Sequence, residues 1–139
     1  MITAVDSSVL PDVFGADPVH GPASREALRR CLAEGSLVAC EVVWAEVAAA
    51  FPEPADAADA LSRLGVLFSP MSADAASGAG AAWQAYRRRG GPRQPVIADF
   101  LVGAHALVQA ERLLTRDRGF YRTAFVDLLV LDPTATDES

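Results

Sequence analysis

Four carboxylates stand at positions in this sequence where a lone charge is unusual. Asp6 directly follows the apolar run "ITAV", and Asp117 comes two residues after the run "RLLT". Glu46 and Asp99 stand inside apolar stretches with helical spacing. Carboxylates gathered in one pocket raise each other's pKa unless a cation neutralises them. Oxygen-only ligands favour Mg²⁺ or Mn²⁺ over Zn²⁺, so the four residues predict metal-dependent hydrolysis of a phosphodiester.

The two strand-end acids also have a plain structural interpretation. An Asp after a strand often belongs to a turn or helps to cap the next helix, and Ser7 or Ser8 could provide such a cap after Asp6. Asp6 and Asp117 belong to the same edge of a sheet only if their strands are parallel. Their role therefore depends on the elements around them.

Glu46 and Asp99 are expected to be buried. Apolar residues three and four positions away on both sides put Glu46 on an apolar helical face. Asp99 has Val96 three residues before it and Gly103 four residues after it. A buried carboxylate must be protonated, paired or bound to a metal ion. Pairing with arginine is the alternative to a metal, although the arginines stand mostly near expected helix ends.

Size and composition indicate a single soluble domain over residues 1–133, with a disordered tail at 134–139. The 139 residues are 51% apolar and 22% charged, which is enough for a real core. No apolar run reaches the length of a membrane span, and the N-terminus lacks the basic region of a signal peptide. Cys31 and Cys40 are too few for a disulfide framework, so we expect a cytoplasmic protein with two buried thiols.

The basic residues are unevenly placed. The net charge is −6, and all 12 basic residues are arginine. One group comprises Arg87, Arg88, Arg89 and Arg93, and another comprises Arg116, Arg118 and Arg122. Arginine can hold a phosphate through two hydrogen bonds, although solvated helix ends would have the same composition.

The hydrophobic pattern predicts strands that alternate with helices. The expected strands are 2–5, 36–40, 66–71, 112–115 and 127–133. The expected helices are 7–14 (interrupted near Pro11), 23–35, 41–51, 54–65, 72–91 and 94–110, with a loop at 16–22 and a short helix or turn at 118–125. This order predicts an α/β fold with a mainly parallel sheet covered on both faces. Ligands of such sheets bind at the carboxyl ends of the strands, near a topological switch point.

Four segments together resemble a known family. The stretches "AVDSSVL", "VVWAEVAAAF", "VIADFLVGAHAL" and "LLTRDRGFY" are similar, in order and spacing, to the four acidic motifs of PIN-domain ribonucleases, and most of all to the VapC toxins of bacterial VapBC modules. The resemblance covers essentially the whole chain. It implies a three-layer α/β/α fold with a five-stranded parallel sheet. It also implies a Mg²⁺- or Mn²⁺-dependent endoribonuclease, usually a homodimer, that a cognate VapB-type antitoxin inhibits.

The resemblance also implies residue roles. Asp6 and Asp99 would be the main metal ligands, while Glu46 and Asp117 would complete or orient the metal–water site. Ser7 and Thr115 match hydroxyl positions that support the ligands. The residues expected to contact RNA phosphates are Arg89, Arg93, Arg116 and Arg118. Cys40 stands where such toxins often have Ser or Thr, so Glu41 or water is expected to satisfy the start of that helix.

Other interpretations fit less well. A haloacid-dehalogenase-like phosphatase needs a second Asp where Ser8 stands, and a receiver domain needs a strand-end lysine. The segment "GAGAAW" lacks the third glycine of a dinucleotide-binding loop and lies inside an expected helix. The alternative that remains is a PIN-like domain that binds a partner or serves as a scaffold without turnover.

Overall fold

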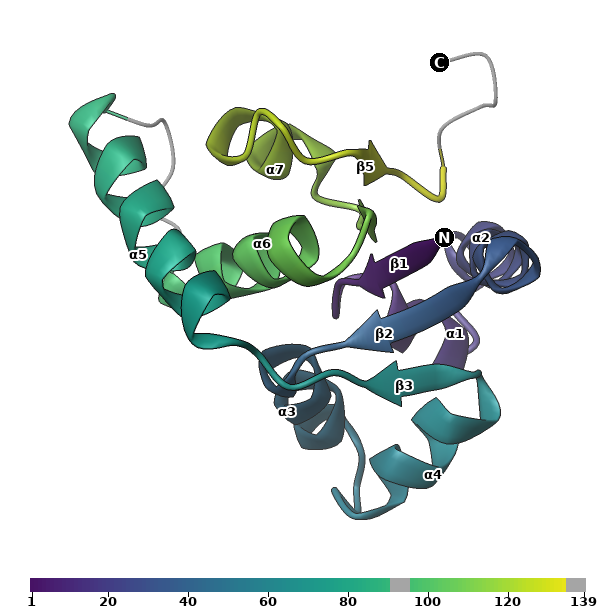
Figure 1. The fold of residues 1–139 in the computed structure, drawn as a ribbon. Coiled ribbons are helices and arrows are strands. Elements are labelled where there is room, and N and C mark those ends of the chain that lie inside the picture. The colour runs from purple at the N-terminus through teal and green to yellow at the C-terminus, as the bar shows by residue number, and fades with distance from the viewer. Residues whose placement is uncertain (91–95, 135–139) are drawn as a thin grey trace.

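The computed structural model describes residues 1–90 and 96–134, and Figure 1 shows their arrangement. The strands are β1 (Ile2–Val5), β2 (Ser36–Ala39), β3 (Val66–Phe68), β4 (Arg112–Leu114) and β5 (Val130–Leu131). The helices are α1 (Leu10–Phe14), α2 (Gly21–Glu34), α3 (Glu41–Ala50), α4 (Asp56–Arg63), α5 (Ala73–Arg88), α6 (Ile97–Gln109) and α7 (Arg118–Ala124).

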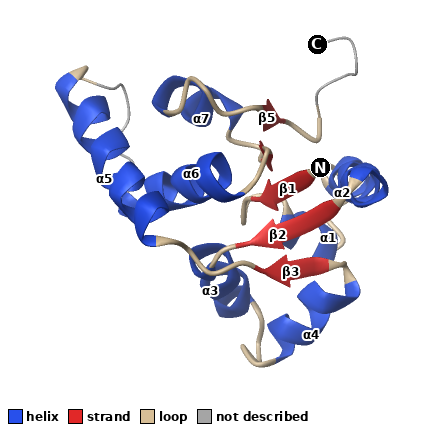
Figure 2. Cartoon of the chain, viewed as in Figure 1, coloured by secondary structure: helices blue, strands red, loops and turns tan. Residues whose placement is uncertain are grey.

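The strands form one parallel sheet in the order β3-β2-β1-β4-β5. The chain moves from β1 outward to β3, then crosses back to β4 and continues to β5. Right-handed crossovers therefore place α1–α4 on one face and α5–α7 on the other. Figure 2 shows β1, β2 and β3 with their arrowheads toward the side where α5 lies. The predicted α/β/α fold with a five-stranded parallel sheet is confirmed.

Local signals explain several element boundaries. Ser72 caps α5 by accepting a hydrogen bond from the Ala75 N–H at 3.1 Å. Cys40 precedes α3 and makes no side-chain cap. The Glu41 carboxylate accepts from the Met71 N–H at 2.9 Å, so it joins the start of α3 to the segment after β3. Pro11 stands in the first turn of α1, where its missing N–H costs nothing, and begins that helix rather than interrupting it.

The structure differs from the expected elements at several boundaries: α1 begins at Leu10 rather than at 7, and β3 ends at Phe68 rather than at 71. Helix α2 begins at Gly21, inside the expected loop at 16–22, because Pro22 occupies a first-turn position. Strand β5 is reduced to Val130–Leu131, because residues 125–128 form a turn after α7, closed by the Leu128 N–H donating to the Phe125 carbonyl at 3.1 Å. Helix α6 begins at Ile97 rather than at 94, and Pro95 lies outside the described residues, as does most of the expected tail.

The core lies on both faces of the central strands. Cys31 and Cys40 are buried and free, as expected. Ala75 and Ala79 of α5 are also buried and serve internal packing, whereas most of the other alanines of this helix are exposed. Gly103 of α6 touches the Phe125 ring so closely that an added Cβ would overlap it. Within the described residues, no helix is long and apolar enough to cross a membrane.

Candidate active site

The four predicted carboxylates come from four segments that meet at the carboxyl edge of the sheet. Asp6 follows β1 and Asp117 follows β4, and these strands are neighbours. Glu46 lies in α3, and Asp99 lies in the first turn of α6. The direction of the crossovers reverses between β1 and β4. This edge is therefore the topological switch point, where α/β sheets bind their ligands.

Asp6 is the most buried of the four, with 7% of its surface exposed. Its Oδ2 accepts hydrogen bonds from Thr115 Oγ1 at 2.7 Å and from Ser8 Oγ at 2.9 Å. Burial raises the pKa of Asp6, and the negative charge of Glu46 raises it further, while the two hydroxyl groups lower it. Within residues 1–90 and 96–134, no positive charge contributes to this pKa. In this part of the chain the Asp6 carboxylate therefore has no cationic side chain to neutralise it.

Glu46 faces the same site from α3, but it is exposed rather than buried. The inner face of α3 is formed by Val43 and Val47, which are four residues apart, and Glu46 lies beside that stripe. The prediction that Glu46 is buried is therefore wrong. Its Oε1 accepts a hydrogen bond from Ser7 Oγ at 2.9 Å.

Asp99 and Asp117 are both half-buried, so the expectation of full burial is also wrong for Asp99. Asp99 Oδ2 accepts from the Val96 N–H at 3.2 Å, which fixes its carboxylate over the start of α6. The Asp117 N–H donates to Thr115 Oγ1 at 2.9 Å. Thr115 therefore contacts both strand-end acids.

All four acids influence the ionisation of one residue, Tyr121 of α7. Its side chain is almost fully buried, with 1% exposed. Burial is the main cause that raises the pKa of its hydroxyl, and the charges of Asp6, Asp99, Asp117 and Glu46 each raise it further. All four carboxylates therefore act on one point. The sequence offered no signal for this tyrosine beyond its place in the last of the four segments.

Sequence reasoning assigned one serine contact incorrectly and missed another. Ser7, expected to hold Asp6, contacts Glu46 instead. Ser8 holds Asp6, lies 3.4 Å from Thr115 Oγ1, and accepts from the Arg116 N–H at 3.1 Å. A hydroxyl two residues after a strand-end acid is the only signal that pointed to Ser8.

The arginines expected to contact RNA lie in different environments. Arg116 Nε lies 3.0 Å from Asp12 Oδ2 and donates to the Ser8 carbonyl at 3.2 Å. Asp12 has 4% of its surface exposed, so Arg116 also neutralises a buried charge. Arg89 donates to the Thr123 carbonyl at 3.1 Å, which fastens the end of α5 to α7. Arg118 is half-buried, and Arg93 lies outside the described residues.

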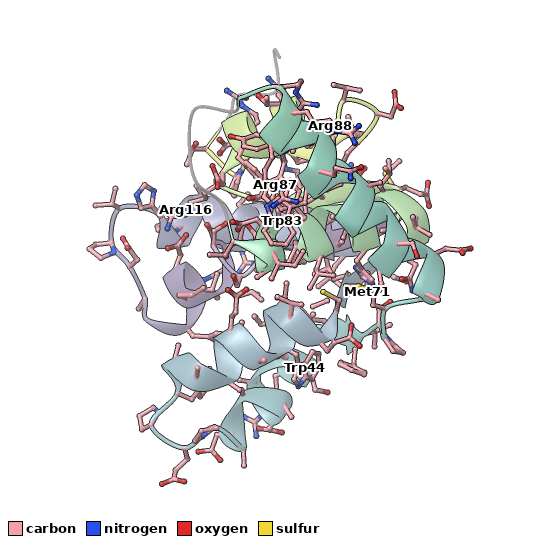
Figure 3. The ribbon with its side chains drawn as sticks, turned by 90° about the vertical axis from the view of Figure 1, so that its left-hand side faces the viewer. Trp44, Met71, Trp83, Arg87, Arg88 and Arg116 are labelled. Atoms are coloured by element: carbon pink, nitrogen blue, oxygen red, sulfur yellow. The ribbon has the colours of Figure 1, made fainter. Side chains whose placement is uncertain are left out.

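Figure 3 looks at the molecule from the side toward which β1, β2 and β3 point. Arg116 lies on one side of this face, and Trp83 with Arg87 lies near its middle. Trp44 and Met71 lie lower on the face.

A divalent cation fits the chemistry of this donor set. No three acidic, imidazole or thiol side chains within residues 1–90 and 96–134 already enclose a metal position. Mg²⁺ is commonly held by one or two carboxylates with water completing its shell, so a preformed cage is not required. The donors are all oxygen atoms, and Asp6 is buried beside a second negative charge. These two properties favour Mg²⁺ or Mn²⁺ over Zn²⁺.

Comparison with known proteins identifies the family. The model of the PIN domain matches residues 3–126. The chain belongs to the PIN domain family. The matched residues include all four acids, and the predicted recognition as a PIN domain is confirmed. No match is found among curated protein sequences.

Solved structures similar to this PIN domain include several toxin–antitoxin complexes. VapBC2 from Rickettsia felis, bound to a promoter DNA fragment, has a TM-score of 0.75 at 17% identity, covering 95% of this chain and 98% of the other. VapBC-1 from Haemophilus influenzae has a TM-score of 0.73 at 18% identity, covering 97% and 100%. Mycobacterium tuberculosis VapC20, described as a sarcin-ricin loop cleaving toxin, has a TM-score of 0.59 at 19% identity, covering 91% and 98%. At these identities the similarity establishes the fold.

Proposed function

We propose that this PIN domain is a Mg²⁺- or Mn²⁺-dependent endoribonuclease toxin of the VapC type. The observation that carries the proposal is that Asp6, Glu46, Asp99 and Asp117 come from four segments that meet at the carboxyl edge of the sheet, where the charge of each raises the pKa of Tyr121. PIN domains are generally nucleases that depend on divalent metals, and the similar structures are toxins of VapBC modules. The cellular setting is the cytoplasm, where the RNA substrate is found and where the two free thiols stay reduced.

Each acid has a distinct task in this proposal. Asp6 and Asp99 hold the metal ion, and Thr115 and Ser8 keep the Asp6 carboxylate in one orientation through its Oδ2. Glu46, steadied by Ser7, and Asp117 orient the attacking water and accept its proton. When bound, the metal ion would neutralise the negative charge of the phosphoryl oxygens and lower the pKa of a bound water molecule.

RNA phosphates are held at the rim of the acidic site. Arg116 and Arg118 flank Asp117, so their charges lie beside the scissile position. Arg89 and Arg93 extend the cationic rim from the α5 side. Such contacts position the strand without reading its sequence.

A VapB-type antitoxin is the expected inhibitor. An apolar groove of about 340 Å³ lies between α1 and α3, lined by Pro11, Phe14, Gly15, Val47, Ala50, Phe51 and Pro52. The apolar face of an amphipathic helix fits a groove of this kind. The exposed Ala49 and Ala50 at the end of helix α3 thus support a partner contact at this groove.

Homodimer formation is the second expected contact. Leu67 and Phe68 on the edge strand β3 are 58% and 50% exposed, and the Trp44 ring packs edge-on against Phe68 at 5.3 Å. An apolar sheet edge of this kind favours association with a second copy. Sedimentation of the chain with and without Phe68→Glu tests this contact.

The experiment that tests the activity is cleavage of a cellular RNA pool by the purified, antitoxin-free chain. Mg²⁺, Mn²⁺ and EDTA are compared, with Asp6→Ala and Asp99→Asn as controls for contaminating nuclease. Discrete products that require metal and disappear in both variants support the proposal. Equal products from the wild type and the variants would overturn it. A wild type that binds metal but cleaves nothing would favour the alternative of a binding domain without turnover.

A further inference from the structure

Trp83 and Arg87 form a stacked pair on the exposed side of α5. The Arg87 guanidinium carbon lies 4.8 Å from the centre of the Trp83 ring, within the range of a cation–π contact. On the inner side, the Trp83 ring stacks with Phe100 at 6.1 Å between ring centroids and 24° between planes. Figure 3 shows Trp83 and Arg87 side by side near the middle of the face that contains the active site. Trp83 and Arg87 are about one helical turn apart, so both belong to the same helix, α5.

The Trp83 ring belongs to an aromatic cluster formed by residues of α5, α6 and α7. Phe100 directly follows Asp99 in α6 and is fully buried. It also contacts Phe120 at 5.4 Å, next to Tyr121. The Trp83–Arg87 pair therefore contacts, through Phe100, the first turn of α6, which also contains Asp99. A cation held on this stack lies on the face toward which β1, β2 and β3 point.

Arg87 differs from the arginines that neutralise acids within the fold. Arg116 pairs with Asp12, and Arg112 pairs with Glu34 at 3.4 Å. Arg87 is exposed, and no carboxylate in the described part of the chain pairs with it. In a chain with a net charge of −6, an arginine held by a ring instead of by an acid keeps its full charge for a ligand.

The geometry of a guanidinium on a ring leaves its donors available. The cation–π contact uses the flat face of the group, whereas its N–H donors radiate in the plane and can hold a phosphate through two hydrogen bonds. We propose that Arg87 binds a backbone phosphate of the RNA strand that enters the acidic site, and that Trp83 is the positioning residue that orients it. This inference rests on the proposed ribonuclease function and adds a contact outside the four acidic segments.

Binding to a labelled single-stranded RNA oligonucleotide tests the inference. Affinity is measured by fluorescence anisotropy at several salt concentrations, with Mg²⁺ present, in the Asp99→Asn background to prevent cleavage. Arg87→Gln is expected to weaken binding several-fold and to reduce the slope of log affinity against log salt by about 0.7, the value for one phosphate on a single strand. Arg88→Gln is the matched control. It removes the same charge from the next residue, which Figure 3 shows at the end of α5 and apart from the stack.

Two further variants separate orientation from charge. Arg87→Lys keeps the charge but loses the planar fork, so it should retain most of the salt slope and still bind a few-fold more weakly. Trp83→Leu should behave in the same way, with the slope kept and the affinity reduced. In the active background, Arg87→Gln is expected to raise KM more than it lowers kcat. If Arg87 only stabilised the end of α5, Arg87→Gln would lower the melting temperature and leave KM unchanged.

The outcomes distinguish this inference from the proposed function. If Arg87→Gln and Arg88→Gln give the same affinity and slope, Arg87 is not a specific phosphate contact, and the inference is overturned even though RNA is cleaved. If the Asp99→Asn chain binds no RNA and the wild type cleaves none, both proposals fail together. Should Trp83→Leu fail to fold, the comparison of Arg87→Gln, Arg87→Lys and Arg88→Gln still decides the question, because Arg87 and Arg88 are both on the surface.

Discussion

The Thr115 hydroxyl donates a 2.7 Å hydrogen bond to Asp6 Oδ2 and thereby joins the end of β4 to the end of β1. Thr115 Oγ1 also accepts a hydrogen bond from the Asp117 N–H at 2.9 Å, so the fully buried Thr115 side chain contacts both strand-end acids. The two contacts are possible because β1 and β4 pair in parallel with Val5 opposite Leu114, which sets Asp6 level with Thr115.

Replacing this hydroxyl should damage both stability and activity. Thr115→Val keeps the shape of the side chain but leaves the Asp117 N–H without its acceptor and removes one donor to Asp6, which we expect to cost about 1–3 kcal/mol. RNA cleavage should fall by at least tenfold, because the Asp6 carboxylate loses its fixed orientation. Thr115→Ser keeps the hydroxyl and should lose much less activity. Denaturant unfolding and cleavage assays on both variants provide the measurement, and equal losses of activity in the two would contradict the role of the hydroxyl.

Neutralising Asp6 should stabilise the metal-free fold. Burial and then the charge of Glu46 hold the pKa of Asp6 above its usual value of 3.8, so ionisation is less favourable in the folded state than in the unfolded chain. The resulting loss of stability is absent below the unfolded pKa and develops as the pH rises through the folded pKa. In EDTA at pH 7, Asp6→Asn is therefore expected to melt at a higher temperature than the wild type, and the difference should shrink toward pH 3. Adding Mg²⁺ should raise the melting temperature of the wild type only.

Arg116 and Arg118 should separate stability from RNA binding. Arg116→Gln leaves the buried Asp12 without its cation, and because the Arg116 side chain is 31% exposed we expect a moderate loss of about 1–3 kcal/mol. Arg118→Gln removes a charge with no carboxylate partner in the described residues and should change stability by less than about 0.5 kcal/mol. Both should weaken RNA binding and flatten its dependence on salt. An unchanged slope in either variant would remove that residue from the set of phosphate contacts.

Two glycines in packed helices should respond in opposite directions to alanine. At Gly103 an added Cβ would overlap the Phe125 ring, so Gly103→Ala should destabilise the fold by about 1–3 kcal/mol. At Gly80 nothing lies within 4 Å of the added atom, so Gly80→Ala should stabilise α5 by about 0.5–1 kcal/mol. Thermal unfolding of the two variants is the test. At Gly78 an added Cβ would lie 4.0 Å from the Ala104 side chain, which is ordinary contact.

The hydrophobic pattern was sufficient to predict most of the helices and strands and the positions of two of the acids. Apolar runs of strand length that end at Asp6 and near Asp117, with helical patterns between them, predicted a parallel sheet whose carboxyl edge carries both residues. That prediction needs only side-chain periodicity and the rule that parallel strands point the same way. Boundaries were less accurate where a short turn shortened β5 and where Pro22 allowed α2 to begin early.

The exposure of Glu46 could not be predicted from the sequence of α3 alone. The apolar residues around Glu46 were compatible with more than one inner face, and packing of α3 on its neighbours selected Val43 and Val47. Likewise, Ser7 and Ser8 are adjacent and chemically alike, so their sequence cannot say which one reaches Asp6. These choices depend on how separate elements are oriented against one another.

The sequence by itself therefore determined the kind of fold and the identities of the four acids, because these follow from periodicity and from residue types at strand ends and within apolar helices. Only the tertiary structure decided the strand order that makes β1 and β4 neighbours, the gathering of the four charges around Tyr121, and the use of Arg116 to neutralise Asp12. The physical reason is that hydrogen bonds and electrostatic interactions act over a few ångströms in space. Residues far apart in the chain come within that range only when the sheet and its helices have packed.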